Sequence, residues 1–64
     1  MRIDRIKLIT EMAKQEITIN AVAEKAGLTR ATVSAVKGGK SCKVETAEKL
    51  AAGLGVPLAT LLEN

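Results

Sequence analysis

The chain of 64 residues has no tryptophan, tyrosine, phenylalanine or histidine, and only one cysteine and one proline. Without histidine, no serine–histidine or cysteine–histidine catalytic pair and no histidine-ligated metal site can form. A single cysteine excludes an intrachain disulfide and a cysteine cluster for a metal. These absences argue against an enzyme, and we expect no cofactor, no metal and no small-molecule substrate.

Long apolar segments are missing as well. No run approaches the roughly 20 apolar residues that a helix needs to span a bilayer. The N-terminal residues M-R-I-D-R-I-K are charged throughout, whereas a secretory signal has an apolar core. We therefore expect a cytoplasmic protein without a membrane partner. The length predicts one domain over residues 1–64, and nothing after the last predicted helix is long enough for an effector domain.

Aliphatic residues must form the core, because 47% of the chain is hydrophobic and none of it is aromatic. They recur at helical spacing in residues 3–15, 19–26, 30–37 and 44–54, and in a shorter fifth segment that Pro57 opens. No strand pattern is present, so the sequence predicts an all-α fold of five helices. The residues expected to face the core are Ile6, Ile9, Met12 and Ala13, then Ile19, Val22, Ala23 and Ala26, then Val33 and Val36, and then Ala47, Leu50, Ala51 and Leu54.

The second and third predicted helices are joined by a glycine turn. Gly27 ends the second helix, because glycine accepts a positive φ without a Cβ clash. Thr18 and Thr29 stand at the N-cap positions, where a hydroxyl accepts an otherwise unpaired backbone N–H. The stretch from Thr18 to Lys40 is therefore typical of a helix-turn-helix.

Charge is distributed unevenly along the chain. Between Glu24 and Glu45 there are five basic residues and no acidic one, which gives this stretch +5, whereas the other five basic and seven acidic residues sum to −2. A run of one charge is most often a solvated face. Because this one coincides with the helix-turn-helix pattern, it favours a polyanionic partner.

Within the helix-turn-helix stretch, a small residue is followed four positions later by a glycine and six positions after that by a branched apolar residue. These residues are Ala23, Gly27 and Val33. With these the chain resembles the lambda-repressor-like DNA-binding domains, the Cro/C1-type (XRE-like) helix-turn-helix family. The resemblance covers nearly the whole chain and implies a compact five-helix bundle. Further matches are Gly39-Lys40, Glu45-Thr46, Leu50-Ala51 and Leu54-Gly55-Val56.

The resemblance implies a sequence-specific, double-stranded-DNA-binding transcriptional regulator, a repressor that binds a near-palindromic operator as a dimer. The third helix would lie in the major groove. Side chains there that would reach base edges are Thr29, Arg30, Ala31, Ser34 and Ala35. Those that would contact phosphates are Thr18, Asn20, Thr32, Lys37, Lys40 and Lys43. Leu58, Leu61 and Leu62 belong either to the core or to a homodimer interface.

Several individual residues leave two interpretations open. Arg30 either pairs with the O6 and N7 of guanine or is an ordinary surface or phosphate-contacting arginine. Ala31 and Ala35 either touch thymine methyl groups or are there as good helix formers. Ile19 stands where the family often has a glutamine that contacts the DNA backbone. That departure and the small, weakly polar third helix favour a protein-interaction module that keeps the fold with weak or no operator recognition. An antitoxin is a further alternative, which a co-encoded partner would favour.

Three other features carry less weight. Gly39-Lys40-Ser41 is similar to the end of a phosphate-binding P-loop, but Ser34 stands at the required glycine and no strand precedes it. Cys42 in the same loop is expected to be a passive exposed thiol. In the first predicted helix the charged side chains are expected to face solvent, with phosphate contact as the less favoured alternative; they are Arg2, Arg5, Lys7 and Glu11.

Overall fold

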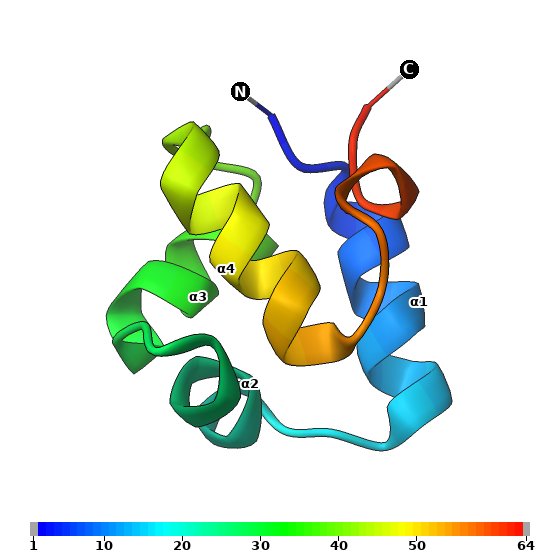
Figure 1. Ribbon diagram of the computed structural model, residues 1–64, viewed down its shortest axis with the longest axis vertical. Helices are drawn as coiled ribbons and strands as arrows, with labels where there is room; N and C mark the ends of the chain where they lie inside the picture. The colour runs from blue at the N-terminus through cyan, green and yellow to red at the C-terminus, as the bar shows by residue number, and fades with distance from the viewer. Residues whose placement is uncertain (1, 64) are drawn as a thin grey trace.

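Four α-helices and one short 3-10 turn make up the computed structural model, which describes residues 2–63 (Figure 1). They are α1 Arg5–Gln15, α2 Ile19–Ala26, α3 Arg30–Lys37, α4 Val44–Leu54 and η1 Leu58–Thr60. The all-α class is confirmed, but the fifth helix is not. That segment closes one turn, in which the Leu61 amide donates to the Leu58 carbonyl at 2.9 Å. The chain then leaves the helical path, because Leu62 pairs with Ile3 in an isolated antiparallel bridge.

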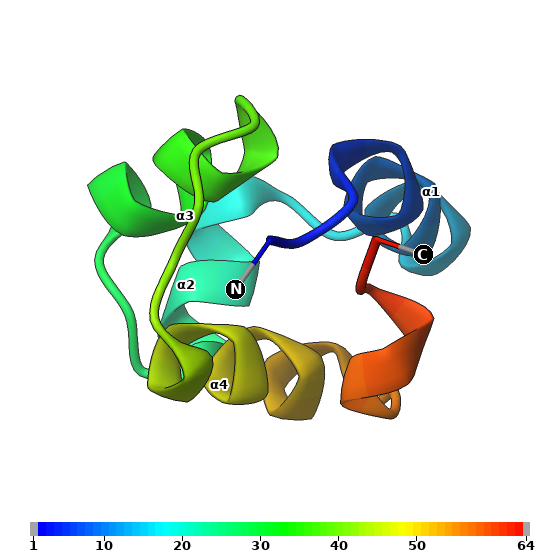
Figure 2. The same cartoon turned by 90° about the horizontal axis from the view of Figure 1, so that it is seen from above.

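The helices surround a core to which α2 is central. In Figure 2, α2 lies between α3 above and α4 below, with α1 and η1 on the other side of the molecule. Within residues 2–63 no polar or charged side chain is buried, so the interior is aliphatic. The core consists of Ile3, Leu8, Met12, Val22, Ala23, Val33, Val36, Ala47, Leu50, Ala51, Leu54 and Leu61.

The apolar face predicted for α1 is right at Met12 but wrong at Ile6, Ile9 and Ala13. Leu8 and Met12 are the buried residues of this helix, whereas Ile6 and Ile9 remain 59% and 37% exposed. The helix also begins at Arg5, later than predicted. Asp4 is its N-cap and accepts hydrogen bonds from the amides of the second and third helical residues. Ile3, directly before this cap, is buried and pairs with Leu62.

The contact between α2 and α4 depends on Gly53. A Cβ at this position would lie 3.0 Å from the Cβ and the backbone nitrogen of Ala26. Real Cβ contacts are rarely this short, so the two helix backbones approach as closely as they do only because residue 53 has no side chain.

The C-terminal leucines divide between core and surface. Leu61 is fully buried, so of the two alternatives it belongs to the core and not to a dimer surface. Leu58 and Leu62 are half-buried and pack against the core. The same segment holds the N-terminus, since the Asp4 amide donates to the Leu61 carbonyl at 2.7 Å and Lys7 Nζ donates to the Leu62 carbonyl at 2.8 Å.

Every helix within residues 2–63 is too short or too polar to traverse a lipid bilayer.

Candidate nucleic-acid interface

The turn between α2 and α3 has the geometry that the sequence predicts. Gly27 follows the last residue of α2 with φ 70° and ψ 32°, in the left-handed region. Its amide donates to the Glu24 carbonyl at 3.3 Å, and the Leu28 amide donates to the Ala23 carbonyl at 2.9 Å. These two bonds satisfy carbonyls at the end of α2 and direct the chain into α3.

The start of α3 is fixed by Thr29. Its Oγ1 accepts the Thr32 amide at 3.2 Å and lies 2.9 Å from the Thr32 hydroxyl, which confirms the predicted N-cap. Val33 and Val36 are buried and attach the helix to the core. Since these two residues determine which face of α3 turns inward, the opposite face is presented to solvent.

The outward face of α3 carries most of the residues predicted to reach bases. Arg30, Ala31 and Ser34 are exposed, and Ala35 is half-buried. Thr29 is also exposed, but its hydroxyl is engaged in capping. No acidic residue occurs anywhere on α3. The face is therefore basic and formed of short side chains apart from Arg30, while its contact with DNA bases stays a prediction.

A shallow hollow connects Arg30 to the beginning of α2. It has a volume of about 230 Å³ and is lined by Thr18, Ile19, Asn20 and Arg30. Thr18 caps α2 by accepting the Ala21 amide at 3.2 Å, as predicted. The hollow brings Arg30 together with Thr18 and Asn20, two of the residues predicted to contact phosphates.

The remaining predicted phosphate residues lie at and beyond the end of α3, except Thr32, which is half-buried in its first turn beside Thr29. Lys37 is half-buried in the last turn, and Lys40 and Lys43 are exposed in the following loop. The Lys40 amide donates to the Ala35 carbonyl at 3.0 Å, which holds the start of the loop against the helix.

Cys42 differs from the prediction of an exposed thiol. It is half-buried and packs against the core, so it helps to attach the loop to the fold. No group of three or more histidine, cysteine, aspartate or glutamate residues within residues 2–63 is arranged to hold a metal ion.

Sequence reasoning gave too little weight to the N-terminal segment. Arg2 donates from its guanidinium to the Gly39 carbonyl at 3.3 Å, directly beyond α3. The arginines near the N-terminus are visible in the sequence, but only the fold brings them to the loop that carries Lys40.

Two short helices joined by a left-handed glycine, the second with a basic outward face, define a helix-turn-helix domain. The chain belongs to the family of Cro/C1-type HTH DNA-binding domains, whose model matches residues 7–64. The family resemblance seen in the sequence is thereby confirmed. The family is described as one of DNA-binding domains.

Solved structures give a second comparison. Two structures of PhpD, described as native with cadmium atoms and as complexed with cadmium and hydroethylphosphonate, are each 28% identical to this chain with a TM-score of 0.84. The match covers 100% of this chain but only 14% of the PhpD chain. No curated protein matches.

Proposed function

We propose that this chain is a sequence-specific transcriptional regulator that reads double-stranded DNA by placing α3 in the major groove. The observation that carries the proposal is the outward face of α3, on which Arg30, Ala31 and Ser34 are exposed. Small side chains let a helix approach the groove floor closely, and an arginine at its start reaches base edges.

The individual roles follow from side-chain chemistry. Arg30 would pair with guanine, a contact worth about 1–3 kcal/mol of discrimination, and Ala31 and Ala35 would touch thymine methyl groups. Thr29 and Ser34 would donate to base edges. The phosphate contacts, which fix register without reading sequence, would come from Thr18, Asn20, Thr32, Lys37, Lys40 and Lys43.

The protein, in the cytoplasm, would repress transcription by occupying its operator and blocking polymerase. Two copies would place their α3 helices in successive major grooves, roughly 34 Å apart on a near-palindromic site. The half-buried Leu58 and Leu62 would contribute to the contact between copies, without the buried Leu61. Light scattering of the free protein and of its complex with the operator tests this arrangement.

The experiment begins with selection of bound sites from a random duplex pool, followed by fluorescence anisotropy titrations at several salt concentrations. Arg30→Ala should weaken binding chiefly at one base position, whereas Lys40→Ala should weaken all sequences alike and reduce the salt slope by about 0.9. Lys49→Ala, on the exposed side of α4, is the matched control and should change neither quantity. Equal losses for every sequence in both test variants would contradict the role of Arg30.

A second candidate is an interaction module that keeps the fold without reading an operator. Two observations favour it: the similar PhpD chains are much longer than this one, and Ile6 on α1 is 59% exposed. A folded sample without any salt-dependent affinity for DNA would support this candidate over the regulator.

A further inference from the structure

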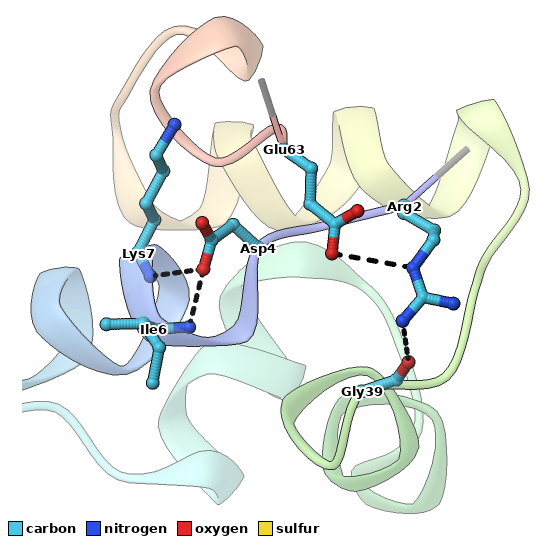
Figure 3. A network of polar contacts seen from close by, with 6 residues as sticks. All are labelled: Arg2, Asp4, Ile6, Lys7, Gly39 and Glu63. Carbon is cyan, nitrogen blue, oxygen red and sulfur yellow. Dashed lines mark hydrogen bonds and ion pairs between the residues drawn. The ribbon is translucent and has the colours of Figure 1, made fainter.

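Arg2 connects both ends of the described chain to the loop that follows α3. Its guanidinium donates to the Gly39 carbonyl at 3.3 Å, and its Nε lies 3.4 Å from Oε2 of Glu63. Figure 3 shows the arginine extending from the N-terminal segment between the glutamate and the end of α3. Both partners of this ion pair are well exposed, with 59% and 45% of their side chains accessible. The pair is therefore weak and easily exchanged for another anion.

Beside this contact lies a groove of about 660 Å³. Its walls are the N-terminal segment on one side and Gly38 and Gly39 on the other, with Glu63 at its edge. Arg5 also lines the groove, and its Cδ lies 3.8 Å from where a Cβ of Gly39 would be. The Arg5 side chain thus lies against the loop immediately before Lys40, at an ordinary van der Waals distance.

The charged residues that line the groove are Arg2, Asp4, Arg5 and Glu63, whose formal charges sum to zero but which are not paired evenly. Oδ1 of Asp4 accepts the amides of Ile6 at 2.9 Å and Lys7 at 3.3 Å, so this carboxylate is occupied as a helix cap. Glu63 is paired with Arg2. Within residues 2–63, Arg5 has no ion-pair partner. Lys40, which directly follows Gly39 in the sequence, is a further exposed cation. Among the described residues, Arg5 in the N-terminal segment and Lys40 in the loop are therefore the two cations here that an added phosphate could pair with.

We propose that Arg2 and Arg5 extend the DNA interface by binding backbone phosphates beside the loop after α3, and that Glu63 competes with phosphate for Arg2. This proposal rests on the proposed function, because it places a duplex against α3 and its loop. A guanidinium matches a phosphate with two parallel hydrogen bonds, which a single exposed carboxylate contact at 3.4 Å does not supply. On binding, Arg2 would exchange Glu63 for phosphate, and Arg5 would gain its first anionic partner.

The test is a salt series of anisotropy titrations with the selected duplex, using Arg2→Gln, Arg5→Gln and Glu63→Gln. Arg5 makes no hydrogen bond or ion pair within residues 2–63, so a change in binding caused by Arg5→Gln is not a change in folding. Circular dichroism verifies the helix content of each variant. Arg2→Gln and Arg5→Gln should each reduce the salt slope by about 0.9. Glu63→Gln should tighten binding about two- to fivefold, the range expected for removal of one exposed competing charge.

A double variant separates direct phosphate contact from mere neutralisation of Glu63. If Arg2 only neutralises the carboxylate, Arg2→Gln with Glu63→Gln should restore the wild-type salt slope. If Arg2 binds phosphate, the slope should stay reduced in the double variant. Lys49→Gln serves as the control for a charge change away from α3.

The outcomes for the two proposals are distinguishable. If Lys40→Gln reduces the slope while Arg2→Gln and Arg5→Gln leave it unchanged, the N-terminal extension is refuted and the regulator stands. If Glu63→Gln leaves the affinity unchanged, the competition is refuted. If the wild-type protein binds no duplex in a salt-dependent way, both proposals fail.

Discussion

Replacement of Gly53 by alanine tests the packing that sets α2, and with it the helix-turn-helix, on α4. The new Cβ would lie 3.0 Å from two atoms of Ala26 and 3.1 Å from a third, its Cα. These are backbone atoms or a methyl group attached directly to the backbone, so no change of rotamer relieves the contact. The two helices must instead move apart.

Two effects of opposite sign determine how much Gly53→Ala changes the free energy of unfolding. In an exposed helix, glycine to alanine stabilises by about 0.8–1 kcal/mol, whereas overpacking a close contact costs about 1–3 kcal/mol. We therefore expect Gly53→Ala to lower the free energy of unfolding by about 1 kcal/mol. For a domain of this size that corresponds to a melting temperature lower by roughly 4–8 °C.

Far-UV circular dichroism during urea and thermal unfolding is the appropriate assay, because the chain has no tryptophan or tyrosine for fluorescence. Ala52→Gly, at the exposed neighbouring position of α4, measures the helix-propensity effect alone and should cost about 1 kcal/mol. If Gly53→Ala stabilised the protein by the amount that Ala52→Gly loses, the helices would lie further apart than described, and the reasoning would be refuted.

Three further predictions concern stability. Glu16 has φ 52°, a left-handed conformation that is strained for a residue with a Cβ. Glu16→Gly should therefore raise the free energy of unfolding by about 1 kcal/mol, and an equal gain from Glu16→Ala in thermal melts would contradict this explanation. Thr18→Ala removes the cap of α2 and should cost about 1 kcal/mol, while Thr18→Ser should cost little; identical melting of the two variants would rule out the cap. Leu50 is fully buried, and Leu50→Ala should cost about 2–5 kcal/mol, as much as the roughly 3–5 kcal/mol that so small a core supplies. Circular dichroism should then show a largely unfolded variant at room temperature, and a cooperative transition near that of the wild type would contradict this expectation.

The parts of the fold that the sequence predicted well are those with local determinants. The bounds of α2, α3 and α4 follow from residues within one turn of each end, such as Thr18, Thr29 and Gly27. Each of these signals acts through hydrogen bonds between near neighbours, so no knowledge of the tertiary structure is needed to interpret it.

The failures have long-range causes. Apolar residues occur on more than one side of α1, so periodicity alone did not distinguish Ile6 and Ile9 from Leu8 as the inward residues. The bridge between Ile3 and Leu62, which joins the residues just outside α1 and η1, is a pairing across the whole chain that periodicity does not reveal.

In the candidate site, too, the features with local determinants were predictable and those with long-range determinants were not. The exposed face of α3 follows from the position of Val33 and Val36, which the sequence provides. The proximity of Arg2 to Gly39 and Glu63 does not, because these partners are 37 and 61 residues away along the chain.

The pairing of residues 3 and 62 has a practical consequence. Since the two ends of the backbone already meet, a short linker could join them, and new termini could be opened in the loop around Ser41 without displacing a helix. Such a circular permutant would keep the four helices in place. For the same reason, the whole unit could be inserted into a surface loop of a host protein whose two attachment points are adjacent.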